Sequence, residues 1–447
     1  MSKKMSMRSF IYLATACGLL LCGTVSASTA RTDWSIACSI RSDKFDYVLP
    51  DALRDNDIDM WIVIDKGRGT DPLANDFGDA SSNGNGIFVF TDRGGDRIER
   101  ASFGRGVDEV KDCEVFDHYG DPSKLGEFVR ERGPETIAVN FTSDEELFPM
   151  EGRHLSDGIS HTDFGNLQMA LGEPFASRLV SAERVIAHWR GRRVALELIE
   201  FSKIAETTRE LLDRALSNEV ITPGKSTLGD VMWWLEEQRK HRGLASGWDP
   251  TVYISPPDGN EIGNTDRVIQ PGDIVQIDYG LGGNNFFTDM KRFAYVLEND
   301  EQDLPEWVLE AFVNSRKVRK MIRENVTSGG PGRPKLELLK QRVGEMGFVY
   351  TEDEQPSDVA GVEVNIGMHP AGNLGHDASG ALFQIYPTRT DYDIQPYSII
   401  SLEFIVFTPT RKWRGNKLPV NIEENVLVTP HGIEWLHVPQ NRPLLIR

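Results

Sequence analysis

The sequence reads PGDIVQIDYG at residues 271–280 and FFTDM at residues 286–290. Each segment places an aspartate, Asp278 or Asp289, in a run of strand-forming residues. The Gly-Gly-Asn-Asn sequence between them, residues 282–285, predicts a hairpin that joins adjacent strands. The two carboxylates are therefore expected to meet on one sheet.

Three more polar residues follow in similar settings. His376 lies in GHDASG, Glu403 follows the apolar run SIISL, and Glu423 lies in VNIEENVLVT. A carboxylate in an apolar strand is costly to bury unless a positive charge balances it. Together with the two aspartates, these side chains predict a site for a pair of divalent cations, because carboxylates can bridge two metal ions.

In this order, the motifs resemble those of the pita-bread metallopeptidases, the family of methionine aminopeptidase, prolidase and Xaa-Pro aminopeptidase. That family carries its metal ligands in the order Asp, Asp, His, Glu, Glu. The resemblance is strongest over residues 190–435. It implies the ligand set Asp278, Asp289, His376, Glu403 and Glu423.

The pattern of elements predicts an α/β fold with more than one domain. Strand-like runs at 59–64, 86–91 and 136–140 indicate a first α/β domain, and helical spacing at 194–217 and 304–326 opens two similar series of helices and strands. We expect a signal peptide over 1–30. With the resemblance, we also expect a creatinase- or prolidase-like α/β domain over 31–182 and a pita-bread catalytic domain with pseudo-twofold repeats over 183–447.

The resemblance also implies an activity. It is that of a dinuclear metal-dependent aminopeptidase similar to Xaa-Pro aminopeptidase, in which a metal-bridging hydroxide attacks the N-terminal peptide bond of a peptide substrate. Glu403 would act as general base and return the proton to the leaving nitrogen. The carboxylate-rich set favours Mn²⁺, with Zn²⁺ or Co²⁺ as alternatives. Dimers are common in the family, so a homodimer is one expectation.

The residues around the ligands depart from the family pattern. Glu261 stands near the position of a substrate-binding histidine, Gly372 replaces a second histidine, and Asn421 replaces an arginine. A further histidine expected seven residues after His376 is absent. Glu261 and His369 are candidate substrate-binding replacements, as are Tyr386 and Arg389 in the loops that flank the ligands. Trp248 is a candidate for the lining of a side-chain pocket. These departures keep two alternatives open: a noncatalytic binding protein on this fold, and a metal-dependent hydrolase of another C–N bond.

The first thirty residues predict export. Three basic residues precede an apolar run at 11–21 and small residues at 25–30, which is typical of a secretory signal peptide and too short to span a bilayer. Without this segment the net charge changes from −19 to −22, which disfavours nucleic acid and membrane surfaces as partners. We expect a secreted or periplasmic protein. In such an oxidising compartment, Cys38 and Cys113 can form a disulfide.

Overall fold

The structure is a computed structural model that describes residues 30–65, 71–78, 86–104, 113–143, 156–256, 263–382 and 389–447. The expected signal peptide lies outside this part of the chain, apart from Ala30, where helix α1 begins. Glu261, Tyr386 and the segment 383–384 also lie outside the described residues. None of the described helices combines the length and apolar character that a bilayer crossing requires.

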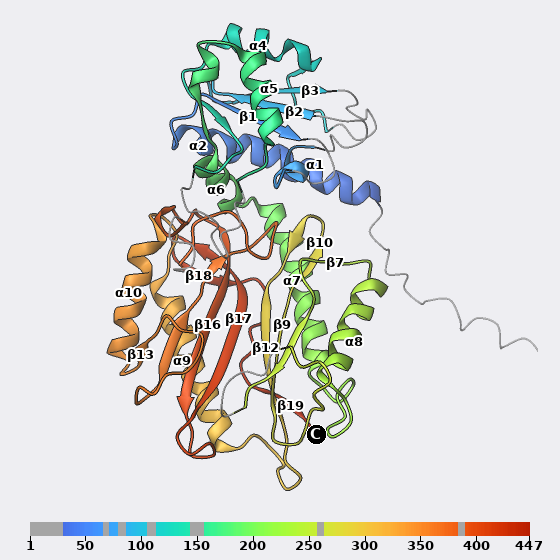
Figure 1. The fold of residues 1–447 in the computed structure, drawn as a ribbon, viewed down its shortest axis with the longest axis vertical. Helices are drawn as coiled ribbons and strands as arrows, with labels where there is room; N and C mark the ends of the chain where they lie inside the picture. The colour runs from blue at the N-terminus through green and yellow to red at the C-terminus, as the bar shows by residue number, and fades with distance from the viewer. Residues whose placement is uncertain are drawn as a thin grey trace, which may run out of the picture.

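A six-stranded sheet forms the first part of the molecule, at the top of Figure 1, with the strand order β4-β3-β2-β1-β5-β6. Helices α1, α2 and α6 pack on one face of it, around Trp61 and Trp189. Helices α4 and α5 pack on the other face, around Phe128 and Leu167. The elements of this part are α1 (Ala30–Tyr47), α2 (Leu49–Arg54), β1 (Met60–Asp65), α3 (Ala74–Phe77), β2 (Gly86–Thr91), β3 (Glu99–Gly104), β4 (His118–Gly120), η2 (Pro122–Lys124), α4 (Leu125–Arg132), β5 (Ile137–Val139), α5 (His161–Leu171), η3 (Phe175–Arg178), β6 (Leu179–Ser181) and α6 (Glu183–Gly191).

A ten-stranded sheet forms the second part, with the central order β13-β14-β16-β17-β12-β9-β8, and a small sheet joins β11, β10 and β7. Its elements are α7 (Ala195–Ala215), α8 (Leu228–His241), β7 (Ala245–Ser246), β8 (Thr251–Ile254), β9 (Ile274–Tyr279), β10 (Leu281–Gly283), β11 (Phe286–Phe287), β12 (Met290–Val296), α9 (Glu306–Asn325), α10 (Gly332–Glu345), β13 (Val349–Tyr350), β14 (Glu363–Ile366), β15 (His369–Pro370), η4 (Arg389–Asp391), β16 (Ser398–Pro409), β17 (Lys417–Thr429), β18 (Gly432–Trp435) and β19 (Leu444–Ile446).

The large sheet has two similar halves. Helices α7 and α8 pack with β8 and β9 in one apolar core, which includes Leu212 and Ile277. Helices α9 and α10 pack with β14, β16 and β17 in another, which includes Phe312 and Phe404. In Figure 1 the two helix pairs lie on opposite sides of the central strands β12, β16 and β17. The predicted α/β fold with repeated helices and strands is confirmed.

The predicted hairpin between the two aspartates is present. Strands β10 and β11 pair in antiparallel fashion, and Asn284 and Asn285 form the two-residue turn between them. Their φ angles are 49° and 67°, the left-handed conformation that a tight hairpin turn requires and that asparagine tolerates better than most residues.

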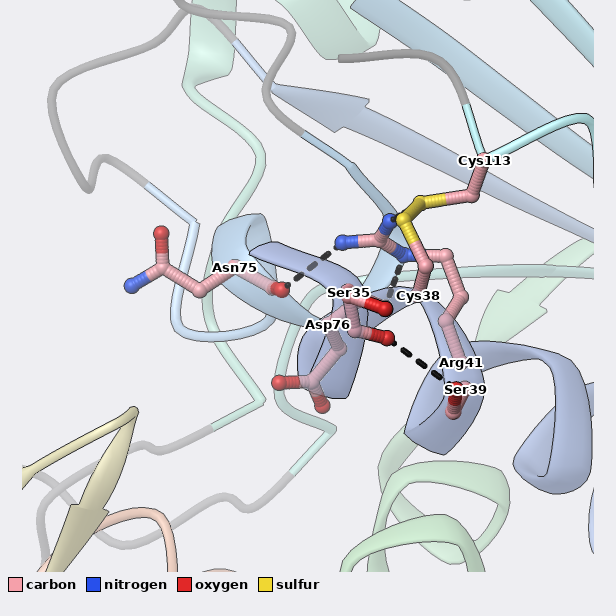
Figure 2. Close-up of a disulfide and its surroundings, with 7 residues drawn as sticks. All are labelled: Ser35, Cys38, Ser39, Arg41, Asn75, Asp76 and Cys113. Carbon is pink, nitrogen blue, oxygen red and sulfur yellow. Dashed lines mark hydrogen bonds between the residues drawn. A yellow bond between two sulfur atoms is a disulfide. The ribbon is translucent and has the colours of Figure 1, made fainter. Parts of the chain in front are cut away.

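A disulfide joins Cys38 of α1 to Cys113, with the two Cα atoms 5.2 Å apart (Figure 2). Arg41, one turn further along α1, lies beside it: its Nη1 atom is 2.8 Å from Sγ of Cys113, and its Nε atom donates to the carbonyl oxygen of Asp76 at 2.9 Å. The disulfide and Arg41 therefore fix α1 against two segments that follow it in the chain.

Candidate metal centre

Four charged residues form one row across four neighbouring strands. Asp278 on β9 is paired with Lys291 on β12, Lys291 with Glu423 on β17, and Glu423 with Glu403 on β16. Residues directly opposite each other in a sheet project from the same face. The register of the sheet, rather than proximity in the sequence, therefore brings these side chains together.

A second row lies two residues along β16 and β17, and β15 extends it. His369 on β15 is paired with Ser401 on β16, and Ser401 with Asn425 on β17. The Oδ1 atom of Asn425 accepts a hydrogen bond from the backbone N–H of Asp289 at 3.1 Å. The Ser401 hydroxyl donates to Oε1 of Glu423 at 2.6 Å. These neutral groups fix the backbone of Asp289 and the carboxylate of Glu423.

Both histidines lie at the site, but at different depths. His369 is fully buried, and its Nε2 atom lies 3.0 Å from Glu423, 3.6 Å from Glu403 and 3.8 Å from Asp289. The side chain of His376 is 31% exposed, and its Nε2 atom lies 3.4 Å from Asp289. The two rings stack with centroids 3.9 Å apart. His369, predicted from the sequence as a substrate-binding residue, thus lies among the predicted ligands.

The ammonium group of Lys291 lies between the carboxylates of the first row. Its Nζ atom is 2.5 Å from Glu423, 2.6 Å from Glu403 and 3.2 Å from Asp278. The lysine side chain is 9% exposed, whereas those of Asp278 and Glu403 are 27% and 19% exposed. The site is therefore open to solvent on the side of these two carboxylates.

Burial and repulsion raise the pKa values of some carboxylates of the site, whereas ion pairing shifts the pKa values of other groups in favour of their charged forms. Burial raises the pKa of Glu403 to about 7 and that of Asp289 well above its usual range, where the charge of Glu423 adds to the effect. The pKa of Glu423 is lowered despite its burial, because Lys291 and His369 stabilise its charge. Burial opposes the charged form of Lys291, but the surrounding carboxylates outweigh it and raise the lysine pKa well above its usual value.

The donor set suits a divalent cation. Three overlapping groups each bring their ligand atoms within 4.8 Å of one another: Asp278, Asp289 and Glu423; His369, Glu403 and Glu423; and Asp289, His369 and His376. The Oδ1 atom of Asp278 is buried and has no hydrogen-bond partner among the described residues, as expected of an oxygen that awaits a ligand. Oxygen and imidazole donors of this kind suit Mn²⁺, Zn²⁺ and Co²⁺.

The structure explains one of the departures around the ligands. Gly372, which stands where a histidine was expected, has a φ angle of 148°, and a Cβ atom there would lie 2.0 Å from Nη2 of Arg193. That guanidinium group instead binds Asp377 at 2.8 Å, next to His376. Arg389 donates to the carbonyl oxygen of the same Asp377 at 3.0 Å. These residues hold the His376 loop.

Trp248 lies at the edge of the site and is half-buried. A Cβ atom added to Gly375 would lie 2.5 Å from its ring, and one added to Gly280 would lie 2.6 Å from it. The indole therefore packs directly on the backbone before His376 and at the end of β9. Glycine is required at both positions because the ring leaves no room for a side chain.

Sequence reasoning missed Lys291, Ser401 and Asn425. Lys291 follows Asp289 by two residues, and Ser401 and Asn425 lie two residues from Glu403 and Glu423. Alternation along a strand places such residues on the same face. The signal was therefore present for all three, once the strands had been assigned.

Comparisons with known proteins assign the chain to a family. The model of metallopeptidase family M24 matches residues 200–430, more than half of the chain. The chain belongs to metallopeptidase family M24. All five predicted metal ligands lie within the matched residues. A search of curated proteins found no match.

Solved structures of M24-type enzymes share the fold. An X-Pro aminopeptidase from Thermotoga maritima MSB8 aligns with a TM-score of 0.62 at 15% identity, over 88% of this chain and 99% of that one. An Xaa-Pro dipeptidase from Bacillus anthracis aligns with a TM-score of 0.59 at 14% identity, over 91% and 99%. A prolidase from Pyrococcus horikoshii OT3 aligns with a TM-score of 0.57 at 17% identity, over 90% and 99%. At such identities, the likeness establishes the fold alone.

Proposed function

We propose that the mature chain is an exported, metal-dependent aminopeptidase similar to Xaa-Pro aminopeptidase, which hydrolyses the N-terminal peptide bond of a short peptide. The observation that carries the proposal is the convergence of Asp278, Asp289, His376, Glu403 and Glu423, on separate strands and loops, within one M24 fold. A bound divalent ion would polarise the scissile carbonyl and make water more acidic. Mn²⁺ is the favoured ion, with Zn²⁺ and Co²⁺ as alternatives.

Glu403 is the residue we propose as general base. Its carboxylate is partly exposed, unlike that of Glu423, which is fully buried. A carboxylate on the open side can accept the proton of the attacking water and deliver it to the leaving nitrogen. Glu423 is bonded to Ser401 and His369 and is fully buried, so its carboxylate is not accessible to a substrate.

Export is supported by two features. The N-terminal segment 1–30 has the composition of a signal peptide, and the only cysteines beyond it, Cys38 and Cys113, form a disulfide. Disulfides persist in oxidising compartments, which favours a secreted or periplasmic location. The strongly acidic mature chain disfavours nucleic acid and anionic membranes as partners, so we propose a peptide as the main partner.

A preference for proline after the N-terminal residue is a further part of the proposal. The solved relatives named above include Xaa-Pro enzymes. The half-buried ring of Trp248, packed against Gly375 beside His376, offers an apolar surface suited to a prolyl ring. This surface would recognise the residue whose nitrogen leaves.

The test is peptide cleavage by purified residues 31–447, followed by mass spectrometry. A panel of Xaa-Pro and matched Xaa-Ala dipeptides and tripeptides is incubated with Mn²⁺, Zn²⁺ or Co²⁺, and with a chelator. We expect release of the N-terminal residue, inhibition by the chelator, and a loss of about 10²- to 10⁴-fold in Glu403→Gln. Glu434→Gln, an exposed glutamate on β18 of the same sheet, is the control that keeps activity.

Two observations favour a second candidate, a noncatalytic binding protein on the same fold. Lys291 lies among the carboxylates, and Gly372 has no side chain with which to contact a substrate. Bound metal without cleavage of any peptide in the panel would favour this candidate, or a hydrolase of another C–N bond, over the aminopeptidase.

A further inference from the structure

Lys291 divides the carboxylate cluster into two sides. An ammonium group has three N–H donors, and Nζ of Lys291 has three carboxylate partners, Glu423, Glu403 and Asp278, at 2.5, 2.6 and 3.2 Å. All three donors are thus directed at carboxylate oxygens. The ammonium group of Lys291 therefore has no donor left for a further partner.

The two glutamates each direct one oxygen to Lys291 and the other to His369. Oε2 of Glu423 faces Nζ of Lys291, and its Oε1 faces Nε2 of His369 at 3.0 Å. Oε1 of Glu403 faces the lysine, and its Oε2 lies 3.6 Å from the same histidine nitrogen. Carboxylates that bridge two cations divide their oxygens in this manner. Here one of the two cations is the ammonium group.

Distance excludes a metal ion at the position of the ammonium group. Divalent ions bind carboxylate oxygens at about 2.0–2.2 Å, so a second ion on the oxygens of Asp278, Glu403 and Glu423 would overlap with Nζ of Lys291. Like charges at such short range would also repel each other strongly.

Charge balance points the same way. Four carboxylates, those of Asp278, Asp289, Glu403 and Glu423, gather around Lys291 and His369. The lysine and one divalent ion offset three of these four negative charges. A second divalent ion beside the lysine would give the site a net positive charge in a partly buried setting, which is unfavourable.

We propose that Lys291 is a resident cation that replaces one of the two metal ions, so that the site binds a single divalent ion on the side of Asp289, His369 and the oxygens of Glu403 and Glu423 that face His369. His376, 3.4 Å from Asp289, borders the same side. The inference rests on the proposed metal dependence and changes its stoichiometry from two ions to one.

The test measures the number of bound ions, independently of activity. Wild type, Lys291→Ala and Lys291→Arg are loaded with Mn²⁺ and dialysed. The metal content is then measured by elemental analysis, titration calorimetry gives the stoichiometry, and electron paramagnetic resonance distinguishes isolated from coupled Mn²⁺ pairs. We expect one ion with an uncoupled spectrum in wild type and Lys291→Arg, and two ions with a coupled spectrum in Lys291→Ala.

Lys417→Ala is the matched control. Lys417 is also a buried lysine on β17 of the same sheet, paired with Glu363 away from the cluster, so its loss reports the general effect of removing a buried ammonium group. It should bind one ion, like wild type. Circular dichroism confirms that each variant is folded, and the wild-type stoichiometry stays decisive if Lys291→Ala is unfolded.

Each outcome has a defined meaning. Two coupled ions in wild type, or a single ion in folded Lys291→Ala, would overturn the inference and leave the proposed peptidase function standing. One ion in wild type without peptide cleavage would overturn the function and leave the inference standing. No metal in wild type or in any variant would overturn both.

Discussion

Removal of the disulfide between Cys38 and Cys113 should destabilise the first part of the molecule by a calculable amount. The two cysteines are 75 residues apart. In the chain-entropy model, a crosslink of this span stabilises the folded state by about 4.5 kcal/mol, because it restricts the unfolded chain. Contacts of Arg41 with the carbonyl oxygens of Asp76 and Asn75 do not depend on the sulfur–sulfur bond, so α1 should stay docked in the reduced protein. Reduction should therefore act mainly on the unfolded chain, and the full entropic term is an upper limit because residual structure in that chain lowers it.

The assay is urea unfolding of wild type and of Cys38→Ala/Cys113→Ala, each with and without a reductant. Tryptophan fluorescence reports the transition, since Trp61 and Trp189 both lie in the core beside α1. The unfolding free energy of wild type should fall by about 2–4.5 kcal/mol on reduction. The double variant should have the unfolding free energy of reduced wild type, and the reductant should not change it. An unchanged wild-type midpoint, with mass spectrometry proving that the bond is reduced, would refute the reasoning.

Three further predictions concern charge and packing. Burial lowers the pKa of Lys44 from 10.5 to about 8, so its contribution to stability is present above pH 10.5 and lost as the pH falls to 8. Relative to Lys44→Met, the unfolding free energy of wild type, measured with urea, should rise by about 3 kcal/mol between pH 8 and 10.5. Gly375→Ala should place a methyl group against Trp248, displace His376 and weaken Mn²⁺ binding in calorimetry, and Trp248→Ala in the same chain should restore part of the affinity. Asp289→Asn should abolish Mn²⁺ binding in elemental analysis while the fold is kept in circular dichroism, because Asp289 belongs to two of the three ligand groups.

The sequence predicted the elements that carry the site because their signals are local. The alternation around Asp278 and the Asn284–Asn285 turn were enough to place two strands and the hairpin between them. The series of helices and strands followed from periodicity in the same way. These features depend on neighbours a few residues apart, which the sequence displays directly.

Other features depend on register and on distant contacts. The role of His369 as a substrate contact stays a prediction, but its position among the metal ligands was not foreseen: the pairing of β15 with β16 places it opposite Ser401, where its ring faces Glu423. Position 372 has no room for a side chain, because the guanidinium group of Arg193, nearly 180 residues earlier, fills the space next to it. Neither contact has a local signature, since only the folded sheet decides which strands lie side by side.

The first part of the molecule also contributes to the geometry of the metal centre. Asp377, next to His376, is 1% exposed and lies 2.8 Å from Arg193 and 3.6 Å from Arg190. Arg190 is in turn 3.0 Å from Asp76 of α3, and the amide of Asn285 in the hairpin turn lies 3.4 Å from the same aspartate.

A buried charge that loses its partner is strongly destabilising, so the pairing of Arg190 with Asp76 should be maintained. Arg190 in turn helps to fix the loop that carries His376. Both parts of the molecule therefore contribute to the site. The strands of the large sheet supply the carboxylates, and Asp76 of the first part holds the guanidinium of Arg190 next to the loop of the partly exposed His376. On this geometry, the six-stranded sheet and its helices support the metal centre itself, in addition to covering one end of the large sheet.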